Sequence, residues 1–303
     1  MNAAPVLAGY LVAVGFVAPH LVLRARWPHW APALAAAAWL ALAVSFAVGV
    51  ALFAYNLARP AAPLHRGLWG LLHSCGLDIG GPGAVPAVVN RLAVVLPAAV
   101  GIVLTSGFCF QLVRARRARA RHREVLDLVG RPAPRLGATV LPYAVPAAYC
   151  LPGRRPRVVV SDAAVRSLTP GQLAAVLEHE RAHITGRHHL ALAAVEAFHS
   201  VFRRLPLARH AREQTALLLE MVADDRALRG HSGEALATAM YEMAAARTPK
   251  GAFAAGGHTV VIRLKRVLGP RTAPHPALRG AMTAATAAAP MLPLLLACPP
   301  ALG

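Results

Sequence analysis

Four stretches of this 303-residue sequence are long and apolar enough to cross a lipid bilayer, which constrains its fold more than any other feature. A spanning helix needs about 20 consecutive residues that are almost free of charge. Only 15% of the residues are charged, against roughly 25% in a typical soluble domain, and 56% are hydrophobic. This composition excludes an intrinsically disordered chain and disfavours an ordinary soluble enzyme. The expected spans cover residues 6–23, 31–57, 92–113 and 281–303.

An alternative interpretation of the first stretch is a signal peptide that is later removed. No positive charge precedes this stretch, whereas Arg24 and Arg26 follow it, so the charge pattern favours a helix that is retained. The third stretch is followed directly by six arginines, and such charges mark the cytoplasmic side of a span. We therefore expect a multi-pass protein with both termini outside and residues 114–280 in the cytoplasm.

The six arginines also indicate a polyanionic partner, and the whole chain carries a formal net charge of +19. A basic stripe can mark a nucleic-acid-binding surface, but no DNA- or RNA-binding motif accompanies this one. Beside a spanning helix, anionic lipid headgroups are the simpler partner. We expect contact with the bilayer and no direct contact with nucleic acid. The arginines are Arg114, Arg116, Arg117, Arg119, Arg121 and Arg123.

The segment between the third and fourth spans is long enough for one compact domain, and its pattern predicts helices with a small sheet. Residues 131–137 are rich in proline and are expected to form a linker, followed by a hairpin of residues 147–151 and 157–160. Thr169, Pro170 and Gln172 form a typical helix start. Helices are expected from this start to Gly186 and over residues 188–204, 208–229, 233–246 and 258–268.

The first of these helices contains the pattern His179-Glu180-x-x-His183, the HExxH pattern of zinc peptidases. Residues four apart lie on one face of a helix, so the two imidazoles can bind one Zn²⁺ at about 2.0–2.1 Å. Glu180 is then placed to take a proton from the attacking water and to deliver one to the leaving amine. The alternative is a surface helix whose histidines face solvent.

A catalytic zinc site needs a third protein ligand and an open fourth position. Glu220 and Asp224 lie one turn apart on a later expected helix, in a segment otherwise poor in carboxylates. We expect Glu220 to bind the metal and Asp224 to accept a hydrogen bond from a ligating histidine. Asp225 points about 100° away from Asp224 on a helix and is not chosen. His188 and the adjacent His189 follow the first helix and are interpreted as exposed polar residues.

HExxH followed by ExxxD, in a segment between the third and fourth spans, resembles the bacterial beta-lactam sensor-transducer (antirepressor) family of gluzincin-like membrane metallopeptidases. The resemblance extends over residues 140–268 in motif detail and over the whole chain in membrane layout. It implies a mainly α, polytopic protein of the bacterial cell membrane with four transmembrane helices and an inserted cytosolic α+β zincin-like metalloprotease domain. The expected parts are residues 1–113, 114–280 and 281–303. The matching segments are residues 149–153, 158–162, 173–180 and 263–268.

For the site, the resemblance implies one Zn²⁺ per chain, held by His179, His183 and Glu220, with Glu180 as general base. It also implies that the strand before the HExxH helix pairs with substrate backbone. The implied substrate is a cytosolic protein, with a winged-helix repressor or the chain itself as candidates, and a homo-oligomer is left open. The substrate strand is expected at Arg157, Val158, Val159 and Val160.

The sequence departs from the sensor members because it carries no S-x-x-K or K-T-G motif of an extracellular penicillin-binding domain. The resemblance therefore supports the protease and not the sensing of beta-lactams. Three hypotheses follow. The first is a signalling zinc endopeptidase, the second is a housekeeping protease for damaged membrane proteins, and the third is a receptor or scaffold whose zinc is only structural.

Overall fold

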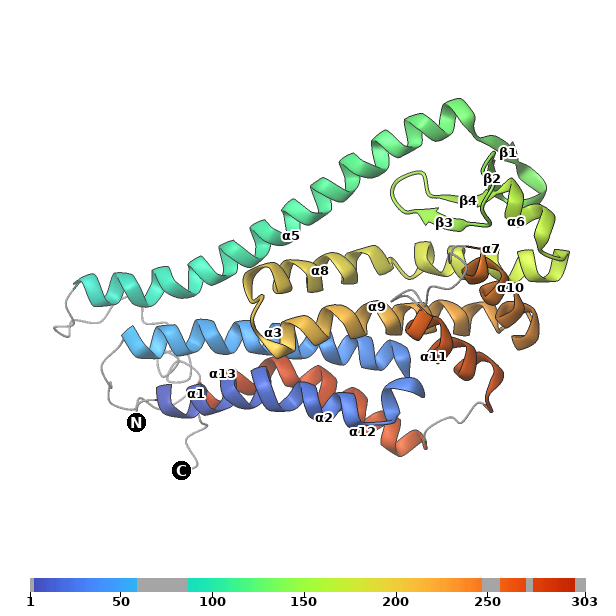
Figure 1. The fold of residues 1–303 in the computed structure, drawn as a ribbon. Coiled ribbons are helices and arrows are strands. Elements are labelled where there is room, and N and C mark those ends of the chain that lie inside the picture. Colours follow the sequence, from blue (N-terminus) through green and yellow to red (C-terminus); the bar gives the residue numbers. More distant parts are fainter. Residues whose placement is uncertain (1–2, 59–86, 247–256, 271–274, 298–303) are drawn as a thin grey trace.

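The computed structural model describes residues 3–58, 87–246, 257–270 and 275–297 (Figure 1). The expectation of a mainly helical protein with a small sheet is confirmed. The segment 59–86 between the second and third expected spans lies outside the described residues, and so does the end of the fourth expected span at 298–303.

Four helical segments in the described part of the chain have the length and apolar composition of membrane spans: Ala4–Arg24, Pro32–Leu57, Val94–Val129 and Pro276–Ala297. The first consists of α1 (Ala4–Val12), a π-helical turn and α2 (Ala18–Arg24). The second is α3 (Pro32–Ala58). The last consists of α12 (Pro276–Ala288), a short 3₁₀ turn and α13 (Leu292–Ala297). Helices α1, α12 and α13 all contact α3.

The third segment belongs to α5 (Ala87–Val129), a single helix of 43 residues. It contains the third expected span and all six arginines, so the expected boundary between residues 113 and 114 falls inside a continuous helix. The helix ends where the amide of Gly130 donates to the carbonyl of Leu126 at 2.8 Å. Figure 1 shows α5 leading from the helix bundle to the sheet.

The four-stranded sheet has the order β1-β2-β4-β3. Its strands are β1 (Arg131–Ala133), β2 (Ala138–Leu141), β3 (Ala148–Leu151) and β4 (Arg157–Ser161). Strand β4 runs antiparallel to β3, which confirms the expected hairpin, and parallel to β2. The linker expected at residues 131–137 is wrong, because β1 pairs with β2 across a left-handed turn at Gly137.

Side chains of β4 alternate between two helices, as the pleat of a strand requires. Val159 is fully buried with Leu126 of α5. Val158 and Val160 pack on the other face against residues of α7 (Pro170–Thr185) such as Leu173. The sheet therefore lies between α5 and α7 and holds the HExxH helix along one face.

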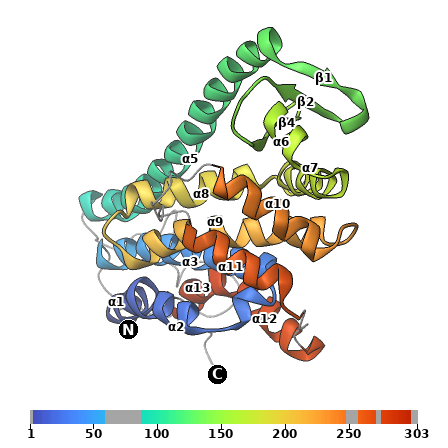
Figure 2. The ribbon, with the colours of Figure 1, turned by 45° about the vertical axis from the view of Figure 1, so that its right-hand side comes forward.

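The remaining helices are α6 (Asp162–Ser167), α8 (His188–Val201), α9 (Pro206–Ala227), α10 (Gly233–Ala245) and α11 (Gly257–Leu268). The sequence predicted all of these except the short α6, although the expected helix over residues 188–204 ends at Val201. In Figures 1 and 2, α8 lies next to α5 and α9 lies next to α3, and both pairs are in contact.

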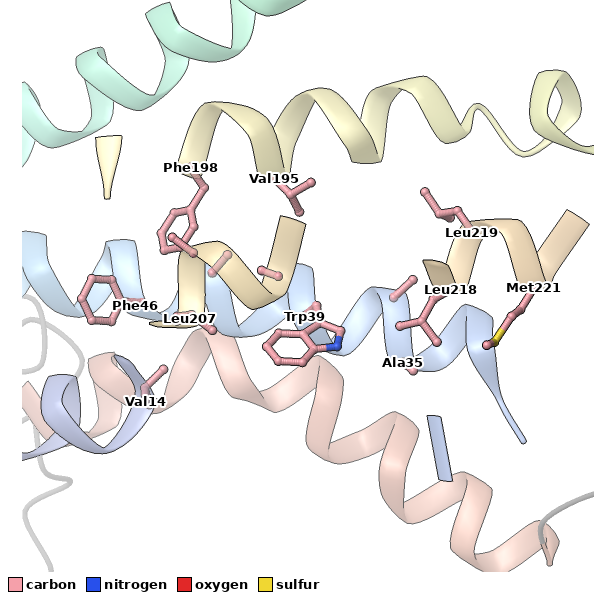
Figure 3. Packing of buried hydrophobic residues seen from close by; sticks show 14 residues of the cluster. Val14, Ala35, Trp39, Phe46, Val195, Phe198, Leu207, Leu218, Leu219 and Met221 are labelled. Carbon is pink, nitrogen blue, oxygen red and sulfur yellow. The ribbon is translucent and has the colours of Figure 1, made fainter. Parts of the chain in front are cut away.

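The largest hydrophobic cluster joins α3 to α8 and α9 (Figure 3). Trp39 of α3 is 1% exposed, and Phe46 contacts Phe198 of α8 edge to face at a centroid distance of 6.1 Å. From α9, the cluster takes Leu207 near one end and Met221 near the other. Since Met221 adjoins Glu220 in sequence, the core that holds the second apolar helix also fixes the helix carrying a candidate metal ligand.

Candidate metal centre

Helix α7 begins with a capping box that places the HExxH pattern. The side chain of Gln172 accepts from the Thr169 amide at 2.9 Å, and the Thr169 hydroxyl accepts from the Gln172 amide at 3.4 Å. Leu173 and the neighbouring apolar side chains face the sheet. His179 and His183 therefore lie one turn apart on another face of the helix, and the side chain of His179 is only 9% exposed.

Three side chains from two helices converge on one point. The Nε2 atoms of His179 and His183 are 3.2 Å apart. The Glu220 carboxylate on α9 places Oε1 3.3 Å from His183 Nε2 and Oε2 3.5 Å from His179 Nε2. Donors at the corners of a tetrahedron around Zn²⁺ at about 2.0–2.1 Å are separated by about 3.3–3.4 Å. The separation of the two Nε2 atoms and that of His183 from Glu220 Oε1 are close to this spacing, and one ligand atom from each of the three residues lies within 4.8 Å of the other two.

Asp224 lies one turn after Glu220 on α9 and supports His179 from behind. Its Oδ1 atom is 3.0 Å from His179 Nδ1, although the N–H is not aligned with this oxygen for a linear hydrogen bond. The Asp224 side chain is 1% exposed. When the His179 ring is neutral, this contact favours the proton at Nδ1 and leaves the lone pair of Nε2 directed toward the other donors.

Arg263 on α11 completes the charge balance of this site, and the sequence analysis assigned it no role. Its Nε and Nη2 atoms donate to the two carboxylate oxygens of Asp224 at 2.8 and 2.7 Å, and its Nη1 atom donates to Glu220 Oε2 at 2.7 Å. Such a paired fork is the strong form of a charged hydrogen bond. No local pattern links α11 to a carboxylate 39 residues away, so only the fold reveals this contact.

Asp225 is directed away from the donors, as expected from its helical position. It accepts hydrogen bonds from Nη1 and Nη2 of Arg266 at 2.9 and 2.7 Å. The Nε atom of Arg266 donates to the carbonyl of His29 at 2.8 Å. Helix α11 therefore contacts both the carboxylates of the site and the turn between the first two apolar segments.

The Glu180 side chain is largely withdrawn from water, and burial raises the pKa of its carboxyl group. Its charge acts on the thiol of Cys150 on β3. Burial and the charge of Glu180 raise the pKa of Cys150 to about 12, so the thiol stays protonated at neutral pH.

The candidate ligands differ in their affinity for protons. Burial lowers the pKa of His183 to about 4, although the charge of Glu220 opposes this effect. Burial also acts against the proton on His179, but its contacts with Asp224 and Glu220 prevail and raise its pKa to about 9. Burial would raise the pKa of Glu220, yet His179 and Arg263 hold it at about 2. Glu220 is therefore an anion at neutral pH.

The expectation that Arg157, Val158, Val159 and Val160 form the free edge of the sheet is wrong. They lie on β4, an inner strand of the sheet, in which Val159 and Val160 pair with both β2 and β3, while Arg157 and Val158 pair with β3. The strand at the open edge next to α7 is β3. The expectation that His188 is exposed is also wrong, because His188 is 4% exposed and its ring contacts the ring of His183.

Comparison with known proteins supports the same chemistry. Residues 113–246 are similar to peptidase family M48, a family of zincin-like metallopeptidases. This region contains His179, Glu180, His183 and Glu220 and ends before Arg263. Neither a curated protein nor a solved structure matches the chain.

Proposed function

We propose that this protein is a membrane-integrated zinc metalloendopeptidase that hydrolyses peptide bonds of a cytosolic protein. The observation that carries the proposal is the convergence of His179, His183 and Glu220, whose ligand atoms lie within 4.8 Å of one another, with Glu180 next to the first of them in sequence. A closed structural zinc site has four protein ligands. In the described part of the chain the donor group has three residues, which favours a catalytic centre.

In this proposal, His179, His183 and Glu220 hold the ion, which when bound acts as a Lewis acid toward the peptide carbonyl and the attacking water. Glu180 accepts the proton that the water loses as it attacks the carbonyl carbon. It then delivers a proton to the amine that leaves. Partial burial raises the pKa of the Glu180 carboxyl above its usual range, which moves it toward the range in which one group can both accept and deliver a proton.

The substrate is proposed to bind as an added strand along β3. The carbonyl of Ala147 accepts from the amide of Ser161 at 2.8 Å. Hydrogen-bonded residues alternate along an antiparallel pair, so Tyr149 also faces β4 while the backbone groups of Ala148 and Cys150 point outward. An extended peptide pairing with these groups would gain main-chain hydrogen bonds and lie beside Glu180.

The proposed location is the bacterial cell membrane, with both termini outside and the sheet and metal centre of residues 114–280 on the cytoplasmic side, while the ends of α8 and α9 that pack near Phe46 of α3 lie at the depth of the second span. It rests on the four apolar helical segments and on the arginine run of α5, in which Arg114, Arg116, Arg117 and Arg121 are exposed. Anionic headgroups are the proposed partner of these arginines. A winged-helix repressor, or the chain itself, is the proposed substrate, and proteolysis would then serve signalling.

Glu180→Gln tests the catalytic assignment in the purified full-length chain, reconstituted in liposomes and loaded with zinc. The variant keeps the shape of the side chain but cannot accept the proton, so we expect zinc content to be unchanged and cleavage of an unfolded protein substrate to fall at least about 100-fold. Glu178→Gln is the matched control. Glu178 is not one of the donors, and its carboxylate pairs with Arg226 at a distance of 3.4 Å. Zinc-loaded wild type without peptidase activity, or equal activity in Glu180→Gln, would refute the proposal.

A further inference from the structure

The two ring nitrogens of His183 are engaged in opposite directions. Its Nε2 atom faces His179 and Glu220, at 3.2 and 3.3 Å. Its Nδ1 atom lies 2.8 Å from Nδ1 of His188, within hydrogen-bonding distance. The two rings meet edge to face, with centroids 4.8 Å apart and an interplanar angle of 90°. A metal-ligating histidine commonly uses its second nitrogen in this way.

The chemistry of the two rings fixes which nitrogen donates. A neutral imidazole has one N–H and one lone pair. If Nε2 of His183 offers its lone pair to a metal, the proton is at Nδ1 and is donated to Nδ1 of His188. His188 must then carry its own proton at Nε2. The arrangement assigns one tautomer to each ring.

The turn between α7 and α8 places the ring of His188 against the end of α7. Arg187 has φ +49°, the only positive φ of a non-glycine residue in the described part of the chain. Gly186 has an ordinary φ of −73°, so it is not required for a left-handed conformation. A Cβ atom at Gly186 would instead lie 2.4 Å from Nε2 of His188. Glycine is therefore needed here for space, because the ring of His188 occupies the position of a side chain.

We propose that His188 is a positioning residue that accepts a hydrogen bond from Nδ1 of His183 and thereby fixes the tautomer and orientation of this ligand. The inference rests on the proposed zinc site. It gives His183 a partner equivalent to the one that Asp224 gives His179. The turn formed by Gly186 and Arg187 is then part of the metal centre.

The test is zinc affinity of the full-length protein, measured by competition with a chromophoric chelator. His188→Leu fills the buried space without an acceptor and should weaken zinc binding about 10- to 100-fold, the usual effect of losing such a partner. His188→Asn offers an amide oxygen to the same N–H and should recover most of the affinity. His231→Leu removes a histidine outside the donor group and should bind zinc like wild type.

Gly186→Ala provides a second route, because it displaces the ring of His188 without removing it and should weaken zinc binding in the same direction. The visible absorption bands of the Co²⁺-substituted protein should change in His188→Leu and resemble wild type in His188→Asn. Equal zinc affinity in His188→Leu and wild type would overturn the proposal, and so would equal losses in His188→Leu and His188→Asn. A wild-type protein that binds no zinc would instead refute the proposed function.

Discussion

At the scale of single residues, each buried carboxylate of the candidate centre is paired with a positively charged or hydrogen-bonding side chain. The carboxylate of Asp224 is almost inaccessible to water, and a buried charge is costly unless it is paired and hydrogen-bonded. Arg263 supplies two hydrogen bonds to Asp224 and one to Glu220. Because these bonds hold both carboxylates toward the histidines, the donor geometry depends on a residue that does not itself offer a metal ligand.

Arg263→Gln tests this dependence. Removing one partner of a buried ion pair typically costs about 3–5 kcal/mol, because the remaining charge stays buried without compensation. We expect a loss of this order in the free energy of unfolding of the metal-free protein, measured by denaturant titration in detergent. Lys265→Gln is the control, since it removes an exposed cation from the same helix. Equal stability of the two variants would show that Arg263 is not needed to compensate Asp224.

The proton affinity of His179 predicts how zinc binding depends on pH. Contacts with Asp224 and Glu220 outweigh burial and raise its pKa to about 9, so the ion must displace a proton at any pH below this value. His183, with a pKa of about 4, adds no such competition at neutral pH. Apparent zinc affinity should therefore rise about tenfold per pH unit from roughly pH 6 to 9 and level off above.

Chelator competition at a series of pH values measures this dependence. Asp224→Asn removes a negative charge beside His179, which lowers the pKa of the ring, so the levelling should move to lower pH in this variant. A zinc affinity that is constant between roughly pH 6 and 8, where a histidine proton would compete, would contradict the assignment of His179 as a protonated ligand in the metal-free protein.

At the scale of elements, the sequence predicted helix boundaries and side-chain contacts correctly where the contacting residues are close in sequence. Thr169, Pro170 and Gln172 predicted the start of α7 because capping involves residues three apart. The spacing of His179 and His183 predicted their convergence for the same reason, since one helical turn brings them together. The pairing of Glu220 with them required only that two helices pack.

Contacts between distant segments were not predictable in this way. The resemblance placed the substrate strand on residues 157–160, and the sequence did not predict β2, which has only four residues and pairs with β4 in parallel across a long connection. Residues 131–137 resembled a linker because proline is rare in strands, yet β1 is an edge strand, where proline is tolerated. Burial of His188 follows from the left-handed backbone of Arg187, a conformation that the sequence does not indicate.

The capping box of α7 gives a prediction for this element. Thr169→Ala removes the side-chain oxygen that accepts from the Gln172 amide, which typically costs about 1 kcal/mol of folding stability. We expect this loss in denaturant titration with unchanged zinc affinity, because the cap lies at the other end of the helix from His183. Thr185→Ala, which removes a hydroxyl bonded within the last turn, should have a smaller effect. A larger loss of folding stability in Thr185→Ala than in Thr169→Ala would contradict this prediction.

At the scale of the whole molecule, the apolar helices and the candidate metal centre share one core. Helix α9 packs along α3 and carries Glu220 and Asp224 at its far end. Strand β3 and helix α7 form the other side of the site. The position of the second apolar helix is therefore coupled to the site through α9, and through α11 by the bond from Arg266 to the carbonyl of His29.

Trp39→Ala tests this shared core. Truncating a buried tryptophan costs roughly 3–5 kcal/mol through lost contacts and the cavity left behind. We expect both a lower unfolding temperature and weaker zinc binding, because α9 loses its support on α3. Trp30→Ala is the matched control, since Trp30 is 44% exposed and should leave both properties nearly unchanged. If Trp39→Ala is strongly destabilised but keeps full zinc affinity, zinc binding does not depend on the packing of α9 against α3.

The proposed catalytic centre requires that His179, His183 and Glu220 together bind one zinc ion with a fourth position left open. X-ray absorption spectroscopy of the zinc-loaded, full-length protein tests it most directly. We expect one zinc per chain, with imidazole scattering from two histidines and only nitrogen and oxygen donors at about 2.0–2.2 Å. Glu220→Ala should lose tight binding. A sulfur donor at about 2.3 Å, or a chain that retains no zinc, would contradict the account.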